Sequence, residues 1–203
     1  NVLIPNMVGI RIFGEATLAL SAGYLLAAFI ETGPDNLGVL YLSPSRGKDK
    51  QGVSRATVVL IHKLLLGVLL GLVLFLLAPS LERLYGLDAL YFRLSALSVP
   101  LLGAHTFLIA ASLAVSRTRL AVLAQLSYAV VHPLLPLALF FLGYSDVGTL
   151  ILCALFSSFL VALFLGTALV RNGTISSSLK GQSNCFAIRS TLSGAIGLGT
   201  PRW

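Results

Sequence analysis

The chain has 203 residues, of which 57% are hydrophobic and only 10% are charged, and its formal net charge is +7. Water-soluble domains carry about 25% charged residues, so this composition excludes a soluble globular fold. The positive charge does not indicate a nucleic-acid-binding protein, because the lysines and arginines stand beside apolar stretches and in short loops. That distribution is typical of a protein embedded in a lipid bilayer.

Five apolar stretches predict five transmembrane helices, which we expect at residues 12–31, 57–78, 94–115, 120–144 and 147–170. The last three contain no Asp, Glu, Lys or Arg, and each exceeds the roughly 20 residues that a helix needs to cross the hydrocarbon layer. The first is the weakest, because its uncharged centre, Ala16–Ile30, is short. The sequence therefore predicts an all-α fold, a polytopic membrane helical bundle over residues 1–171.

The positive charge of the connections alternates along the chain. Residues 32–56 contain four Lys and Arg and residues 116–119 contain two, whereas the turn at residues 143–146 contains none. The connection between the second and third stretches has two basic residues besides the acids Glu82 and Asp88. The positive-inside rule then places residues 32–56, residues 116–119 and the region after the last span in the cytoplasm.

Two features at the ends of the chain suggest that it is a fragment. The orientation above puts the start of the first span outside, which requires either an exported N-terminus or the loss of one earlier helix. The chain begins with Asn1 rather than Met, which favours the loss. Residues 172–203 are rich in Ser and Gly and contain no span-length apolar run. We expect them to form a flexible cytoplasmic tail, with a truncation or an altered reading frame as possible origins.

Ionisable residues within or beside the spans are the candidates for function, because charge is costly inside a membrane. Arg11, Lys63 and Arg93 are candidates for lining a substrate route, and His105 and His132 are candidates for proton coupling. The alternative for the cations is an interfacial position, reached for Lys63 by extending its stem toward the surface and for Arg11 by pairing with Glu15. The alternative for the histidines is a hydrogen bond to a backbone carbonyl of a neighbouring helix.

Prolines and glycines predict how the helices bend and pack. Pro100 in the third span and Pro133 and Pro136 in the fourth remove backbone donors, so we expect kinks there. Gly67 and Gly71 form a G-x-x-x-G pattern that favours close approach of another helix.

Motifs of enzyme and metal chemistry are missing from the sequence. It contains no phosphate-binding loop, no nucleophile elbow and no H-E-x-x-H pattern, and its two cysteines lack the spacing of a metal site. We therefore expect no catalytic residues, no metal and no cofactor, and a protein that is not an enzyme.

Three segments carry a resemblance to a known family. Residues 13–21 (FGEATLALS) are similar to its Gly-Glu-containing entry into a helix, residues 33–46 to its basic cytoplasmic loop, and residues 77–100 to its helix end and restart. On these segments the chain resembles the N-terminal half of bacterial polysaccharide flippases (Wzx-type), which share a superfamily with the lipid II flippases and the multidrug (MATE) exporters. The resemblance covers about residues 2 to 171 and implies one incomplete lobe of a two-lobe transporter.

The resemblance implies that the protein moves a polyprenyl-diphosphate-linked oligosaccharide across the membrane, with the bilayer and a second lobe of the same protein as partners. Two alternatives remain open at this stage. The first is a MATE-type cation or drug antiporter, which is disfavoured because such proteins usually bind cations through acidic residues inside their helices, and the last three spans have none. The second is a membrane assembly subunit without transport of its own, which would need no polar route. The sugar, the coupling ion and the oligomeric state do not follow from the sequence.

Overall fold

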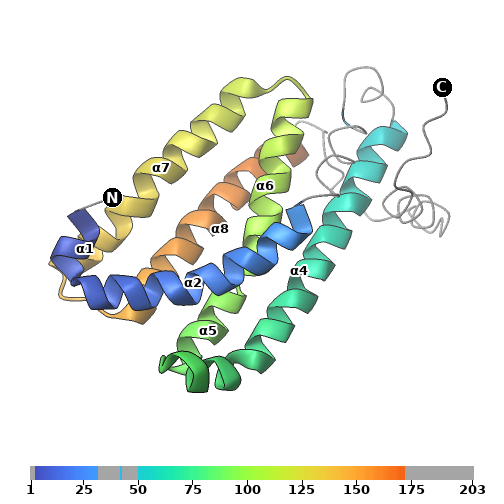
Figure 1. The fold of residues 1–203 in the computed structure, drawn as a ribbon. Coiled ribbons are helices and arrows are strands. Elements are labelled where there is room, and N and C mark those ends of the chain that lie inside the picture. The colour runs from blue at the N-terminus through green and yellow to red at the C-terminus, as the bar shows by residue number, and fades with distance from the viewer. Residues whose placement is uncertain (1–2, 32–41, 43–49, 172–203) are drawn as a thin grey trace, which may run out of the picture.

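The structure is a computed structural model that describes residues 3–31, 42 and 50–171 (Figure 1). These residues form helices and short turns, and none of the described residues lies in a strand. The helices are α1 (Leu3–Val8), α2 (Ile10–Glu31), α4 (Lys50–Tyr85), α5 (Ala89–Ala96), α6 (Ser98–Ala114), α7 (Thr118–Phe141) and α8 (Val147–Arg171). The predicted tail at residues 172–203 lies outside the described residues, as does most of the predicted loop at residues 32–56.

Five spans in the described part of the chain are long and apolar enough to cross a membrane, which confirms the predicted helical membrane bundle. Their bounds are Ile10–Ile30, Ala56–Tyr85, Ala89–Ala114, Thr118–Phe141 and Val147–Arg171. The second was expected to end at Ala78, but α4 continues through Pro79 to Tyr85. The apolar stretch marks only the part of a helix that contacts lipid. The helix itself can continue into polar sequence, because its backbone hydrogen bonds do not depend on the polarity of the side chains. The first span begins at Ile10, two residues before the predicted start at residue 12.

The third span is divided into two helices. Pro100 lies in the first turn of α6 and has no N–H to donate to the carbonyl of Ala96, which its ring also crowds. The chain instead makes a tighter turn, in which the N–H of Leu97 donates to the carbonyl of Leu94 at 3.1 Å. The helix therefore breaks at Leu97, three residues before the proline. By contrast, α7 runs as one helix through both Pro133 and Pro136.

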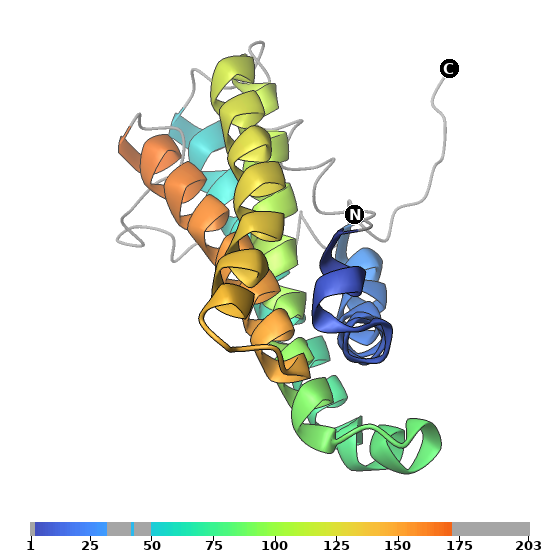
Figure 2. The same cartoon turned by 90° about the vertical axis from the view of Figure 1, so that its left-hand side faces the viewer.

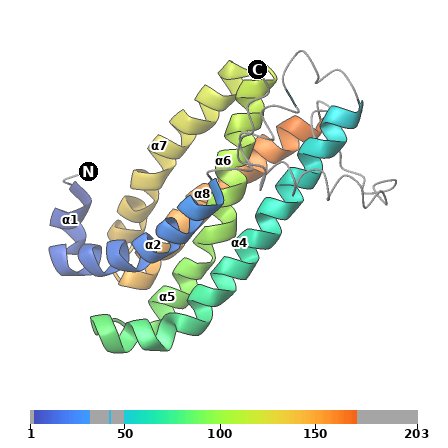
Figure 3. The same ribbon diagram turned by 45° about the vertical axis from the view of Figure 1, so that its right-hand side comes forward.

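Helix α6 lies at the centre of the bundle, in contact with α2, α4, α7 and α8 (Figures 1 and 3). One end of the bundle carries the start of α4, the α6–α7 connection and the end of α8, and the opposite end carries the α4–α5 and α7–α8 connections (Figure 1). The first end includes the basic residues Arg117, Arg119 and Arg171. We call it the basic end, and it contains the described connection that was predicted to be cytoplasmic.

Glycines allow the backbones to approach closely at two interfaces. A Cβ on Gly67 would lie 2.8 Å from Cα of Pro100, and one on Gly71 would lie 2.8 Å from the carbonyl oxygen of Ala96. Helix α4 therefore packs directly on the break in the third span. Helix α2 also packs close to this break, because a Cβ on Gly23 would lie only 2.6 Å from the carbonyl oxygen of Ser95. Close packing of this kind holds membrane helices together, because lipid offers little hydrophobic driving force between them.

Candidate functional site

The side chain of Lys63 lies inside the bundle. It is 1% exposed, and its Nζ donates a hydrogen bond to Oγ1 of Thr106 on α6 at 2.9 Å. The Thr106 hydroxyl in turn lies 3.1 Å from the carbonyl of Leu102, to which it donates. The lysine stem passes directly over Gly103, where an added Cβ would lie in ordinary van der Waals contact with Cε of Lys63 at 3.5 Å. The interfacial interpretation of Lys63 is therefore wrong, and this cation is held between α4 and α6.

The other two cationic candidates lie on the surface and face different neighbours. Arg11 is exposed and donates from Nε to Glu15 at 2.8 Å, which is the helical pair expected from their spacing. The exposed Arg93 places its guanidinium carbon 5.3 Å from the centre of the Phe75 ring, within the range of a cation–π contact. The three cations thus contact three different partners instead of meeting along one route.

The two candidate histidines are brought together by Tyr128, a residue that the sequence pattern did not single out. The ring of Tyr128 on α7 lies 5.2 Å from that of His105 on α6, edge to face, and 5.0 Å from that of His132, nearly parallel. His132 also reaches α8, where its Nδ1 lies 3.1 Å from Oγ of Ser157. The spacing of Tyr128 and His132 was a signal that could have found this cluster, because residues four apart share a helix face.

The environments of the two histidines differ. His105 is 6% exposed, and its Nδ1 is a buried atom without a hydrogen-bond partner among the described residues. Leaving such an atom unpaired costs about 1–3 kcal/mol. His132 is only half-buried and lines a groove of about 250 Å³ between α2, α7 and α8. Neither histidine makes the alternative contact, a hydrogen bond to a carbonyl of a neighbouring helix, within the described part of the chain. The third histidine, His62, has its Nδ1 2.9 Å from the carbonyl of Val58 on its own helix.

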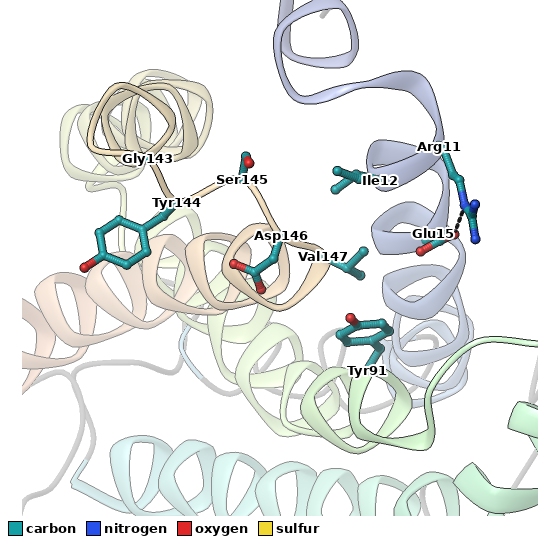
Figure 4. Close-up of a pocket in the computed structure, with 9 residues that line it drawn as sticks. All are labelled: Arg11, Ile12, Glu15, Tyr91, Gly143, Tyr144, Ser145, Asp146 and Val147. Atoms are coloured by element: carbon teal, nitrogen blue, oxygen red, sulfur yellow. Dashed lines mark hydrogen bonds and ion pairs between the residues drawn. The ribbon is translucent and has the colours of Figure 1, made fainter.

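A second hollow lies at the end of the bundle opposite the basic end (Figure 4). It is an open pocket of about 580 Å³ between the start of α2, the α7–α8 connection and Tyr91 of α5. Glu15 and Asp146 contribute carboxylates to its lining, while the guanidinium of Arg11 points away from Asp146 along the outside of α2 (Figure 4).

The wall of this pocket is built by a tight connection. Helix α7 ends where Gly143 adopts φ 89°, and the N–H of Tyr144 donates to the carbonyl of Leu139 at 3.0 Å. This is the Schellman pattern of helix ends. Asp146 then accepts from the backbone N–H and the hydroxyl of Thr149, which lowers the pKa of its carboxyl and caps the start of α8. Asp146 therefore has a structural role at the pocket rim.

Comparisons with known proteins do not assign this chain. No protein-family model matches it, and neither the curated proteins nor the solved structures include a match. Among the described residues, no three His, Cys, Asp or Glu side chains group in a way that could hold a metal ion. What the described residues do show is a multi-pass helical bundle with a buried ammonium group and a His–Tyr–His cluster, and its function has to be argued from those groups.

Proposed function

We propose that this protein is a membrane transporter that flips a polyprenyl-diphosphate-linked oligosaccharide across the bacterial inner membrane during polysaccharide biosynthesis. The observation that supports the proposal is the ammonium group of Lys63, which is held within the spanning bundle. A cation at such a position is costly, and in membrane proteins it marks a substrate path or an ion path. A diphosphate headgroup needs a compensating positive charge when it leaves water.

The position of Lys63 along its helix suits that role. Lys63 lies seven residues into the span that begins at Ala56, which corresponds to a depth of about 10 Å. The diphosphate of a lipid-linked sugar enters from the same end of the bundle if the basic end faces the cytoplasm, as the charge pattern predicts. Lys63 is 1% exposed in the structure, so we expect the headgroup to reach Lys63 and Thr106 after it has passed the arginines of the basic end and α4 and α6 have separated.

The proposal requires two lobes that together form the transport cavity. The described bundle would form one lobe, and a second lobe of the same protein would complete the cavity, as the resemblance implies. The apolar residues exposed along α4, such as Leu65, Leu69 and Leu76, would face lipid or that lobe. On this view the chain needs no catalytic residue, because translocation changes no covalent bond.

A transport assay tests the proposal. The full-length protein is reconstituted into vesicles that contain fluorescent polyprenyl-diphosphate oligosaccharide, and the sugar that becomes accessible to an external lectin is measured over time. Lys63→Met keeps the stem and removes the charge, and a charge-assisted hydrogen bond of about 1.5–3 kcal/mol corresponds to a rate loss of tenfold or more. Arg83→Met, which removes an exposed cation near the other end of α4, is the matched control, and we expect it to change the rate less than twofold.

Two results would contradict the proposal. The wild-type protein could leave the lectin signal at the level of empty vesicles, or Lys63→Met could transport at the wild-type rate. A MATE-type antiporter is the second candidate, since Glu15 lies inside the first span and carboxylates bind cations in such proteins. That candidate would be supported if the vesicles expelled a cationic dye in exchange for protons and left the lipid-linked sugar in place.

A further inference from the structure

A line of hydroxyl groups follows one flank of α2. Thr17, Ser21 and Tyr24 lie four and three residues apart, so they share a face of the helix, and all three are exposed. Thr17 donates to the carbonyl of Phe13 at 2.8 Å and Ser21 donates to that of Thr17 at 2.7 Å. These bonds satisfy the hydroxyl protons of Thr17 and Ser21, and each oxygen keeps a lone pair that can accept from water. This flank is therefore able to border water.

The hydroxyl line forms one wall of the groove that contains His132. The opposite wall consists of His132 and Pro136 from α7 and of Cys153 and Ala154 from α8. Figure 2 shows the arrangement, with α2 seen nearly end-on beside the column of α7 and α8. The groove thus connects an imidazole in the middle of a span with a flank of the bundle that presents oxygen atoms.

The hydrogen bonds of Ser157 favour one tautomer of His132. The Ser157 hydroxyl lies 2.9 Å from the carbonyl of Cys153 and 3.0 Å from that of Ala154, and both carbonyls can accept its proton. We therefore assign the proton of Ser157 to the backbone of α8 and its oxygen as the acceptor of Nδ1–H of His132, whose Nδ1 lies 3.1 Å away. Neutral His132 then has a lone pair on Nε2, which makes no hydrogen bond to the described residues and is available to a proton.

Tyr128 is placed to stabilise the charged form of this histidine. Its ring lies at 22° to that of His132 with the centres 5.0 Å apart, so a protonated imidazole would rest on the face of the phenol ring. Cation–π contacts of this kind contribute about 0.5–2 kcal/mol. The other titratable groups around His132 are Tyr24 from α2, Cys153 from α8 and, beyond Tyr128, His105 from α6. The lining of the groove includes no Asp, Glu, Lys or Arg.

We propose that His132 binds the coupling proton of the transport cycle and that the groove between α2, α7 and α8 is the path by which water reaches it. A proton from water joins the lone pair of Nε2 while Nδ1–H stays bonded to Ser157, and the same proton returns to water when it leaves. His105, which is closed off behind Tyr128, does not exchange protons with this path. The role of the proton in transport rests on the proposed function, but proton binding itself can be measured without transport.

Nuclear magnetic resonance of the histidine rings tests proton binding. The full chain is labelled with nitrogen-15 in histidine, placed in lipid nanodiscs and compared at pH 8 and pH 5, with His105→Gln and His132→Gln used to assign the signals. We expect the nitrogens of His132 to change to the doubly protonated pattern and those of His105 to keep the neutral one. Unchanged His132 signals, or protonation of His105 alone, would overturn the inference.

Cysteine labelling tests the water path and does not require a histidine variant to fold. Thr17→Cys and Leu18→Cys, each in a background with Cys153→Ala and Cys185→Ser, place a thiol at neighbouring and exposed positions of α2. Of these two positions, only position 17 lines the groove. A water-soluble methanethiosulfonate reagent should modify position 17 at least tenfold faster than position 18, and equal rates would refute the water path.

The vesicle assay separates this inference from the proposed function. If His132 becomes protonated and position 17 is reactive, but no lipid-linked sugar is flipped, the proposed substrate is wrong and the proton site stands. If sugar is flipped and His132 stays neutral at pH 5, the transporter stands and the inference fails.

Discussion

Helix α2 has two flanks that pack in opposite ways. On one flank Gly23 lies so close to Ser95 and Ser98 that no side chain fits between the backbones. On the other flank, hydroxyl side chains face His132 across a groove of about 250 Å³. Lipid supplies little force that would close such a groove, so a membrane helix is held where small residues let backbones touch and stays apart elsewhere. The position of one glycine thus decides which flank of α2 is sealed.

The largest expected effect comes from adding a methyl group to the sealed flank. Gly23→Ala places a Cβ 2.6 Å from the carbonyl oxygen of Ser95, and backbone cannot give way easily. We expect the free energy of unfolding to fall by about 2–3 kcal/mol, as is usual for overpacking. Unfolding by sodium dodecyl sulfate in mixed micelles, followed by circular dichroism, measures this quantity.

Gly14→Ala in the same helix is the control for that substitution. A Cβ on Gly14 has no atom within 4 Å among the described residues. Alanine is the better helix former by about 0.5–1 kcal/mol, so this variant should be slightly stabilised. Equal losses in both variants would show that α2 is not sealed at Gly23.

A smaller effect is expected behind the open flank. Ser157→Ala removes the acceptor of the Nδ1–H of His132 and leaves this donor unpaired, which should lower the free energy of unfolding by about 1–2 kcal/mol. The neighbouring Ser158 donates to Ala154 on its own helix at 3.0 Å, so Ser158→Ala should cost less than about 0.5 kcal/mol. The same micelle titration compares the two variants, and a larger loss at position 158 would contradict the assignment.

The smallest effect is expected at the rim of the open pocket that lies at the end of the bundle opposite the basic end. Hydrogen bonds from Thr149 lower the pKa of Asp146 in the folded protein. A lowered folded pKa adds stability above the unfolded value of about 3.9, and this stability is lost as the pH falls through the folded pKa. Asp146→Asn keeps a helix cap without the charge. We therefore expect the stability difference between wild type and Asp146→Asn to shrink as the pH is lowered below about 4, and a difference that stays constant would argue against the cap.

The sequence predicted the number and type of the spans because apolar runs of this length are rare outside membrane proteins. It also predicted the Arg11–Glu15 pair, which depends only on helical spacing, and the turn at Gly143, which depends on local residue types. The site was harder to predict. Lys63 and Thr106 lie 43 residues apart, and only tertiary packing shows that the lysine faces α6 and not the membrane surface.

The same limit applies to the histidine cluster. Both His105 and His132 were selected as buried polar residues, but their link through Tyr128 depends on how α6 and α7 are oriented about their axes. That orientation follows from packing across the whole bundle, including the contacts of Gly67 with Pro100, and no local pattern encodes it. Likewise, the hydroxyls of α2 line a groove only because α7 and α8 lie opposite them, which the sequence of α2 alone does not show.

The length of α4 makes bilayer thickness an experimental variable. The span Ala56–Tyr85 has 30 residues and corresponds to about 45 Å, whereas the hydrocarbon layer is about 30 Å thick. Its last turns carry Glu82 and Arg83, so this polar end either extends beyond the hydrocarbon layer or is kept near the headgroups by a tilt of the helix. Acyl chains of increasing length should therefore change the tilt of α4 relative to the membrane normal. Because Gly67 and Gly71 of α4 pack against Pro100 and Ala96, a change of tilt should also change the force on the break in the third span.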